Sequence, residues 1–400
     1  MKQGWEIKKL GEVAHISPSK SEVKTFALNP MDMVSFLPME DLTIGRTFVH
    51  PNKQKTLSEV EGSYTYFKEG DVLLAKVTPC FENGKLAIAK GLCNNIGFGS
   101  SEYIVIRPMQ HIVNSQYLIY LLQTNAFRNG GRTLMIGACG LKRLPKPYVA
   151  NYELPVPSLA EQERIVEELD CLSGIIEKKK QQLKELDALS ESIFYSMFGD
   201  PITNEKGWEV KKLGEVCIIN PQKKEAATIV DNTDEVSFLP MEDLSIKACY
   251  IQPKQSRIFS EVQSSYTYFK NGDVLLAKVS PCFENGKIGI AQNLINGVGF
   301  GSSEYIVFRL NTSILKEYLY FFLQDATFVE EATKNLTGTS GLRRVPKSFV
   351  ENRVIGIPPL TLQQEFADKI EAIEKQKELI RQSITQTEEL FNSRMDYYFN

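Results

Sequence analysis

Eight polar side chains recur at matching positions in two similar stretches of the chain. The stretches are GDVLLAKVTPCFENGK at residues 70–85 and GDVLLAKVSPCFENGK at residues 272–287, which differ at one position only. Lysine ammonium groups donate hydrogen bonds and asparagine amides both donate and accept them, so this set is suited to recognition by hydrogen bonding. The recurring side chains are Lys76, Thr78, Asn83 and Lys85 in the first stretch, and Lys278, Ser280, Asn285 and Lys287 in the second.

Residue patterns that support catalysis or metal binding are missing from the sequence. His15, His50 and His111 all lie in the first half of the chain, none recurs in the second half, and their spacing suits no metal. Neither GxxxxGK[ST] nor a GxGxxG that opens a helix occurs. The Asn-Pro dipeptides at positions 29 and 220 lack the following proline and aromatic residue with which adenine methyltransferases hold a flipped base. We therefore expect a protein that binds its target, with no catalytic residue and no metal site.

The elements that must position these residues are duplicated as well, because the repeat extends through the whole chain. Matching segments are GWEIKKLGEV at 4–13 with GWEVKKLGEV at 207–216, VSFLPMEDL at 34–42 and 236–244, and GFGSSEYIV at 97–105 and 299–307. The offset falls only from 203 residues at the start of the repeat to 201 near its end. The sequence therefore consists of two tandem copies of a unit of about 200 residues.

Short strands separated by turn residues dominate each copy of the unit. DVLLAKV and SEYIVI predict buried strands of aliphatic residues. Asn83-Gly84 and its counterpart at 285–286 lie between apolar runs and predict type I′ hairpin turns, which need positive φ at two residues. Helices are predicted over residues 115–123 and 315–324. The predicted fold class is α+β, with two repeated, mostly β domains.

A long amphipathic helix is predicted after each domain, beyond the proline-rich segments at residues 154–157 and 357–360. Apolar residues recur there in alternating steps of four and three, and this 3.5-residue period is typical of a coiled coil. The seam positions are Ile165, Leu169, Leu172, Ile176, Leu183 and Leu186 in the first helix, and Phe366, Ile370, Ile373, Ile380, Ile384 and Phe391 in the second. Polar seam positions of one helix match apolar positions of the other, which favours an antiparallel pair within the chain and an approximate two-fold axis. The alternative is that each helix packs separately on its own domain.

The net charge of −3 is unevenly distributed. Residues 1–150 carry 18 Lys+Arg against 12 Asp+Glu, whereas residues 151–200 carry 5 against 11. The globular parts are thus more basic than the segments that follow them, which allows a local nucleic-acid face. The sequence lacks a membrane span and a signal peptide, so we expect a cytoplasmic protein that contacts no membrane. The seven cysteines form no CxxC pair, and we expect reduced, mostly buried thiols.

Four features together resemble the specificity subunit of Type I restriction-modification systems. They are the doubled domain, the opening GWExKKLGEV, the LPxPxLxEQxxI entry into a long helix, and the junction MFGDPITNEKGW at residues 197–208. The resemblance implies two target-recognition domains, each of which reads one half of a split double-stranded DNA sequence, and two spacer helices in an antiparallel coiled coil. It also implies two modification (methyltransferase) subunits that carry S-adenosylmethionine, and motor-nuclease restriction subunits that use ATP and Mg. No cofactor is expected on this chain.

The resemblance divides this sequence into four parts. They are target-recognition domain 1 at residues 1–153, spacer helix 1 at 154–198, target-recognition domain 2 at 199–354 and spacer helix 2 at 355–400. Family members commonly have two dissimilar recognition domains, whereas the two domains of this chain are close copies. Like domains related by a two-fold axis should read like half-sites in inverted orientation, so we expect an interrupted, nearly palindromic target.

With DNA as the expected partner, the duplicated polar side chains become candidates for base readout. Lysine can reach guanine and asparagine can reach adenine in the major groove. A second group, the basic turn before each long helix, is expected to contact phosphates and position the protein. Its members are Lys142, Arg143 and Lys146 in the first unit, and Arg343, Arg344 and Lys347 in the second. The alternatives are that Asn-Gly serves only the turn and that these cations are ordinary surface charges.

Two other functions stay open on the sequence. In the first, a non-catalytic structural adaptor presents two protein-binding β modules on a coiled coil, which the residual acidity and the lack of a long basic tract favour. In the second, the chain is a recognition subunit whose partner both methylates and cuts DNA.

Overall fold

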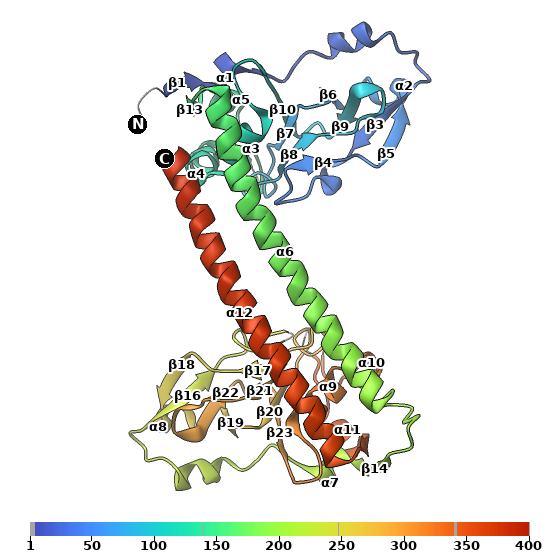
Figure 1. The fold of residues 1–400 in the computed structure, drawn as a ribbon, viewed down its shortest axis with the longest axis vertical. Helices are drawn as coiled ribbons and strands as arrows, with labels where there is room; N and C mark the ends of the chain where they lie inside the picture. Colours follow the sequence, from blue (N-terminus) through green and yellow to red (C-terminus); the bar gives the residue numbers. More distant parts are fainter. Residues whose placement is uncertain (1–4, 139, 247, 340–341, 400) are drawn as a thin grey trace. The chain divides into compact units, whose positions relative to one another are not determined.

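The computed structural model describes residues 5–138, 140–246, 248–339 and 342–399. Gly4 of the opening motif, Cys139 and the outermost residues of the predicted domain boundaries lie outside the described residues. The chain divides into two units, one made of Met1–Glu177 with Thr385–Asn400 and one made of Lys178–Ile384. Figure 1 shows that each unit contains its own sheets and a part of each of two long helices.

The first unit contains two main sheets and two small ones. The five-stranded sheet has the order β2 (Ala14–Ile16), β10 (Tyr103–Pro108), β7 (Val72–Ala75), β8 (Leu86–Ala89) and β4 (Phe48–Val49). The four-stranded sheet has the order β5 (Lys53–Thr56), β3 (Met33–Leu37), β9 (Ile96–Gly99) and β6 (Thr65–Lys68). The two-stranded sheets join β1 (Glu6–Lys9) to β13 (Glu153–Val156) and β11 (Ile136–Ala138) to β12 (Leu141–Arg143). The predicted strands in DVLLAKV and SEYIVI correspond to β7 and β10.

Short helices connect these strands. They are α1 (Leu10–Val13), η1 (Lys20–Phe26), η2 (Met39–Asp41), α2 (Leu57–Val60), η3 (Cys93–Asn95), α3 (Ser115–Gln123), α4 (Asn125–Leu134) and α5 (Lys146–Asn151). The predicted helix over residues 115–123 is confirmed as α3, which begins where the Asn114 side chain accepts a hydrogen bond from the Gln116 N–H. The Thr124 side chain caps α4 in the same way.

The second unit repeats this topology strand for strand in its two main sheets. Its five-stranded sheet has the order β15 (Cys217–Ile219), β23 (Tyr305–Leu310), β20 (Val274–Ala277), β21 (Ile288–Ala291) and β17 (Tyr250–Ile251). Its other sheets are β18 (Gln255–Ile258), β16 (Glu235–Leu239), β22 (Val298–Gly301) and β19 (Thr267–Lys270), and β14 (Glu209–Lys212) with β24 (Val354–Ile357). Its helices are α7 (Leu213–Val216), η4 (Lys223–Thr228), α8 (Phe259–Val262), η5 (Ile295–Gly297), α9 (Lys316–Gln324), α10 (Ala326–Lys334) and α11 (Lys347–Asn352). The predicted second helix is therefore present as α9, and the α+β class is confirmed.

The two long helices, α6 (Leu159–Phe198) and α12 (Leu360–Phe399), are antiparallel. In the first unit the Glu168 carboxylate lies 2.6 Å from Arg394 Nε, and Arg164 lies over the ring of Tyr398. In the second unit Asp187 Oδ1 lies 2.8 Å from Lys377 Nζ, and the rings of Phe194 and Phe366 are 5.6 Å apart. Paired residue numbers thus rise along α6 as they fall along α12, which confirms the antiparallel pairing. Every predicted seam position is buried or half-buried.

Both long helices begin later than predicted. Helix α6 begins at Leu159 rather than at residue 154, and α12 begins at Leu360 rather than at residue 355. The intervening residues form β13 and β24, which pair with β1 and β14 at the start of each domain. The prolines that follow cannot donate a ladder hydrogen bond, so they end the strands and separate them from the helices.

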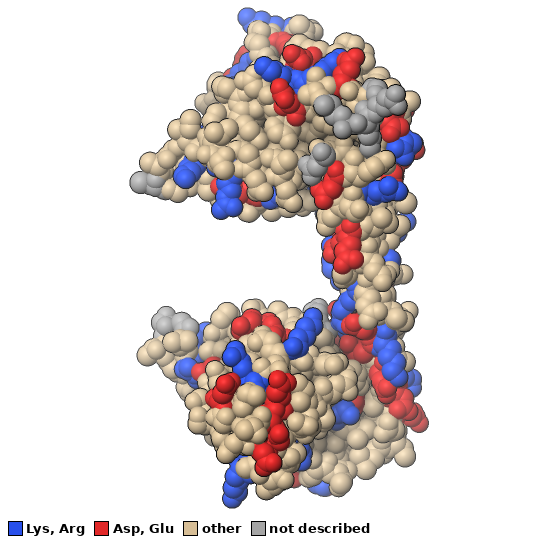
Figure 2. Space-filling view, turned by 90° about the vertical axis from the view of Figure 1, so that its left-hand side faces the viewer, with Lys and Arg blue, Asp and Glu red and all other residues tan. Residues whose placement is uncertain are grey.

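The surface mixes both signs of charge. Figure 2 shows Lys and Arg side chains interspersed with Asp and Glu side chains over the visible face of both domains. No helix among the described residues is both long and apolar enough to cross a membrane.

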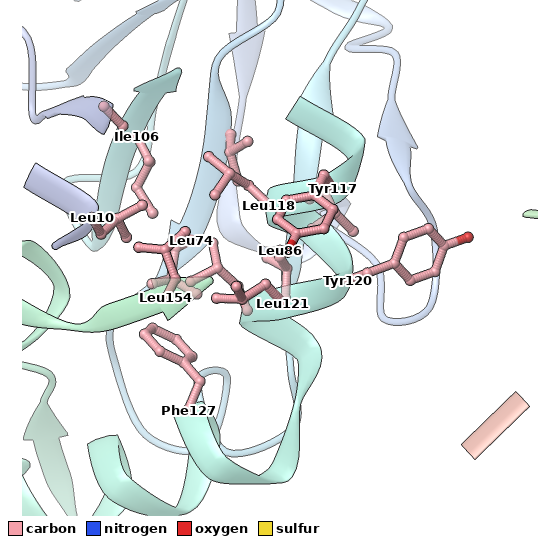
Figure 3. Packing of buried hydrophobic residues seen from close by; sticks show 14 of the residues in the cluster. Leu10, Leu74, Leu86, Ile106, Tyr117, Leu118, Tyr120, Leu121, Phe127 and Leu154 are labelled. Atoms are coloured by element: carbon pink, nitrogen blue, oxygen red, sulfur yellow. The ribbon is translucent and has the colours of Figure 1, made fainter. Parts of the chain in front are cut away.

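The central strands of each domain are buried on both faces. In β7, Val72 and Leu74 join the larger core, whereas Leu73 and Ala75 point to the opposite face and join a second cluster. Figure 3 shows Leu74 and Leu86 meeting Leu118 and Leu121 of α3 in the larger core. The sheet is therefore held between α3 on one side and the four-stranded sheet on the other, and the loops at its strand ends are fixed by packing on both faces.

The expectation of mostly buried cysteines is wrong for the described residues. Cys217 and Cys249 are buried, but Cys171 is exposed and the other described cysteines are half-buried. All six described cysteines are free thiols, and burial raises the pKa of Cys217 to about 12. Cys171 is exposed because it lies on the outer side of α6, between the seam positions.

Candidate nucleic-acid interface

The predicted type I′ hairpin turns are absent. Strands β7 and β8 are joined by residues 76–85, which form successive turns in which the Phe81 N–H donates to the Val77 carbonyl and the Asn83 N–H to the Pro79 carbonyl, both at 3.0 Å. Gly84 has a φ of +72°, but Asn83 is not among the residues with positive φ. Pro79 has no N–H with which to extend the strand ladder, so the helix-like turns replace a tight hairpin. The loop at residues 278–287 has the same hydrogen bonds.

This loop pairs with the basic turn, although the two lie far apart in sequence. The Thr78 N–H donates to the Lys142 carbonyl at 3.0 Å, and the Leu144 N–H donates to the Lys76 carbonyl at 2.8 Å. In the second domain the Ser280 N–H donates to the Arg343 carbonyl at 2.9 Å. The candidates for base readout and for phosphate contact, predicted as separate groups, therefore lie side by side in each domain.

A carboxylate from the recurring segment GFGSSEYIV, whose Ser-Ser-Glu residues the sequence offers as a third contact group by repetition alone, joins the two groups. Arg143 donates three hydrogen bonds of 2.8–3.0 Å to Glu102, and Lys76 Nζ lies 3.9 Å from the same carboxylate. Lys76 also donates to the Ser101 carbonyl at 2.8 Å. The second domain repeats the arrangement with Lys278, Glu304 and Arg344. We call these three residues of each domain the Lys-Glu-Arg cluster; its acid lies in the recurring segment GFGSSEYIV.

Each Lys-Glu-Arg cluster carries one net positive charge. Hydrogen bonds from Arg143 hold the pKa of Glu102 below its usual value, with a further contribution from Lys76, and burial opposes them. Burial lowers the pKa of Lys76, and the charge of Glu102 opposes that decrease. Hydrogen bonds from Arg344 likewise lower the pKa of Glu304. Hydrogen bonds to Glu102 and Glu304 hold Arg143 and Arg344. The guanidinium groups are therefore fixed in orientation.

The other candidates are of two kinds. Some donate hydrogen bonds to acceptors within their own domain, and the others are exposed to solvent. Lys85 and Lys287 point back to the carbonyls of Met39 and Met241, at 3.2 and 2.7 Å. The Thr78 hydroxyl donates to the Lys142 carbonyl and the Ser280 hydroxyl to Glu284. The outward-facing candidates are Asn83, Lys142 and Lys146 in the first domain, and Asn285, Arg343 and Lys347 in the second.

Within the described part of the chain, no group of His, Cys, Asp and Glu side chains could hold a metal ion. His15, His50 and His111 are all exposed. The arrangement can therefore offer amide and cationic hydrogen-bond donors at two like positions, one in each domain.

The chain matches known proteins along most of its length. The family model for the Type I restriction modification DNA specificity domain matches twice, over residues 2–188 and 205–389. The Type I restriction enzyme EcoEI specificity subunit of Escherichia coli is 37% identical over 187 residues, which are 46% of this chain and 31% of that protein. This chain thus spans less than a third of the length of that relative. The Type I restriction enzyme MjaIX specificity subunit of Methanocaldococcus jannaschii is 26% identical, over 92% of this chain and 86% of that protein.

Solved structures share the fold. A chain from the work described as "Structural basis underlying complex assembly and conformational transition of the type I R-M system" has a TM-score of 0.59 at 18% identity, covering 99% of this chain and 97% of that one. The S subunit of a Type I restriction-modification system from M. genitalium has a TM-score of 0.53 at 10% identity, with 100% and 98% covered. The two matches of the family model include nearly all of both repeats, and the chain therefore belongs to the Type I restriction modification DNA specificity domain family, with two copies of the domain in tandem.

Proposed function

We propose that this chain is the DNA-recognition subunit of a Type I restriction-modification complex in the cytoplasm. The observation that carries the proposal is the double match of the DNA specificity domain, one match for each repeat. The Lys-Glu-Arg cluster and the outward-facing candidates support it, because they provide donors for phosphates and base edges in each domain. In this proposal the chain binds double-stranded DNA and performs no chemistry itself.

The chemistry belongs to partner subunits in this proposal. Two modification subunits with S-adenosylmethionine would methylate adenine, and motor-nuclease restriction subunits with ATP and Mg would cleave. The support is that the curated relatives are named as specificity subunits of restriction enzymes. A specificity subunit needs partners that act on the sequence it selects.

The target is proposed to be an interrupted, nearly palindromic sequence. The two loops at residues 76–85 and 278–287 differ only at Thr78 and Ser280, and the hydroxyls of both side chains are used in internal hydrogen bonds. Outward-facing Asn83 and Asn285 are of the same type and occupy matching positions. Two readers with the same donors should select the same half-site.

Single-molecule methylome sequencing tests the proposed function directly. A host that expresses this chain with its neighbouring modification subunit is compared with a host that lacks this chain. New methyladenine at an interrupted inverted repeat is the expected result. Methylation at two unlike half-sites would retain the specificity role but contradict the like-half-site proposal, and the absence of new methylation would favour the structural adaptor.

Residues that bind phosphates and residues that read bases are expected to respond differently to substitution. Changing Lys142 and Arg343 together to alanine should weaken binding to all DNA sequences and reduce the salt slope by about one for each phosphate that is no longer neutralised. Changing Asn83 and Asn285 to alanine should instead alter sequence preference, at about 1–3 kcal/mol for each base that is read. The measurement is binding of target and scrambled duplexes over a range of salt concentrations.

Lys375, an exposed lysine of α12, provides the matched control for charge removal. Lys375→Ala should leave both affinity and salt slope unchanged within error. The two double variants could instead lose the same affinity and keep the same DNA sequence preference. That result would show that the two groups do not have separate roles.

A further inference from the structure

An arginine side chain covers the loop of the first domain at Gly84. Arg128 of α4 donates from Nη2 to the Glu82 carbonyl, and a Cβ atom built on Gly84 would lie 3.5 Å from Arg128 Cζ. The carboxylate atom Glu82 Oε2 is buried in the same loop without a hydrogen-bond partner. The guanidinium group thus occupies the space above the Asn-Gly turn.

The second domain has the same backbone but no arginine at this place. Phe127 and Phe328 are fully buried at matching positions of α4 and α10, so the residue that follows Phe328, Val329, is the counterpart of Arg128. A Cβ atom built on Gly286 would meet nothing within 4 Å. A cavity of about 430 Å³ lies there, bounded by the end of α6, the loop, α9 and α10.

The lining of this cavity suits a planar cation. Glu191 and Glu284 contribute carboxylates, whereas the Glu330 carboxylate pairs with Lys334 at 2.7 Å. The rings of Phe194 and Phe321 are stacked with centroids 5.6 Å apart. The Ser280 hydroxyl donates to Glu284 Oε1 at 2.6 Å, whereas Glu284 Oε2 is buried without a hydrogen-bond partner. Guanidinium is weakly hydrated, stacks on aromatic rings and donates paired hydrogen bonds to carboxylates.

We propose that this cavity of the second domain receives an arginine side chain of a protein partner, in the position that Arg128 fills in the first domain. The acidic lining excludes DNA phosphate as the occupant on grounds of charge. The inference rests on the proposed function only in naming where the partner is sought, among the other subunits of the complex. Recognition of the guanidinium itself depends on the cavity alone.

Equilibrium dialysis of the full chain with labelled N-acetyl-arginine amide tests the cavity. The wild type should bind one capped arginine. Val329→Arg should fill the cavity and weaken binding at least tenfold, whereas Val329→Ile should retain binding. Arg128→Val should leave the number bound at one, because the first domain has Asn129 and Tyr120 where the second has Glu330 and Phe321.

Three further measurements make the test decisive. Capped citrulline, which is neutral, should bind at least tenfold more weakly than capped arginine, and Glu284→Gln should weaken capped arginine binding to a similar degree. Free arginine should bind more weakly than the capped form, because its carboxylate enters an acidic site. The proposal is overturned if the wild type binds no capped arginine, if Val329→Arg leaves binding intact, or if free arginine binds more tightly.

The proposed function is measured separately. Val329→Arg should still bind DNA in the absence of partners, because the first domain has Arg128 at the same place beside Asn83. Its association with the modification subunit, followed by analytical ultracentrifugation, should be at least tenfold weaker. If Val329→Arg associated with the modification subunit as tightly as the wild type does, the partner assignment would be overturned and the proposal of DNA recognition would be unaffected. Failure of the wild type to bind DNA would instead count against the proposed function.

Discussion

Replacing Arg107 by methionine is expected to lower the free energy of unfolding of the first domain by about 3–5 kcal/mol at neutral pH. Arg107 donates two hydrogen bonds of 2.7 Å to Asp71, whose side chain is only 1% exposed. Without the guanidinium, the Asp71 carboxylate stays buried with only the hydrogen bond from the Lys68 N–H and the smaller contribution of the Lys68 charge. Arg309 and Asp273 repeat the pair in the second domain, so Arg309→Met should have the same effect there.

Fluorescence can follow each domain separately, because the chain has two tryptophans. Trp5 packs against the core of the first unit, and Trp208 donates to the Phe198 carbonyl in the second. Urea unfolding in a Trp208→Phe background therefore reports on the first domain. The matched control is Glu22→Gln, because Glu22 contacts the same arginine but is 40% exposed, and its loss should cost about 1 kcal/mol or less. Equal costs for the two variants would contradict the assignment of a buried pair.

The cost of Arg107→Met should depend on pH. Burial raises the pKa of Asp71, and the hydrogen bonds and charge of Arg107 oppose this increase. In the variant that opposition is removed, so the folded-state pKa lies further above the unfolded-state value. The folded variant then binds a proton more tightly than the unfolded chain, and its stability rises as the pH falls through the folded-state pKa. Adding Asp71→Asn to the variant should recover part of the stability at neutral pH and remove this pH dependence.

Replacing Lys377 by methionine is expected to destabilise the packing of α6 on α12 in the second unit by about 3 kcal/mol. The Lys377 side chain is 4% exposed, and its ammonium group bonds to Asp187 at 2.8 Å and to Glu374. Without the ammonium group, these two partly buried carboxylates face each other. Urea unfolding in a Trp5→Phe background, which reports on the second unit, measures the effect.

Lys375 provides the control for this prediction as well. It pairs with Glu371 on the same helix, but the two side chains are 73% and 55% exposed, so Lys375→Met should cost about 0.5 kcal/mol or less. Neutralising all three groups with Lys377→Met, Asp187→Asn and Glu374→Gln should restore most of the stability. If Lys377→Met cost no more than Lys375→Met, the buried ammonium group would not hold the helices together.

The features that the sequence predicts best are those encoded by local periodicity. The seam from Ile165 to Leu186 was predictable because apolar residues recur in steps of four and three, interrupted only at Lys179, whatever surrounds the helix. Helix α3 and strands β7 and β10 were predictable for the same reason. The duplication strengthened these predictions of helices and strands, because two copies of one pattern seldom arise by chance.

Features that depend on contacts between distant segments were not predictable from local patterns. Arg107 and Asp71 are 36 residues apart and meet because β10 pairs with β7. The hairpin predicted from Asn83-Gly84 does not form because residues 76–78 pair with the basic turn, about 64 residues further along the chain. Because of the same pairing, the candidates for base readout and the candidates for phosphate contact lie side by side on one surface. The pairing also directs the Thr78 hydroxyl, predicted as a base reader, to the Lys142 carbonyl, and Lys85 donates instead to the Met39 carbonyl.

The pairing of β1 with β13, and of β14 with β24, has a consequence for how such chains evolve. Each pairing brings the first strand of a domain beside the strand that leads into its long helix. The second domain, which lies between α6 and α12 in the sequence, therefore leaves and rejoins the long helices through one strand pair. Recombination within this strand pair would exchange the complete target-recognition domain and leave the long helices unchanged.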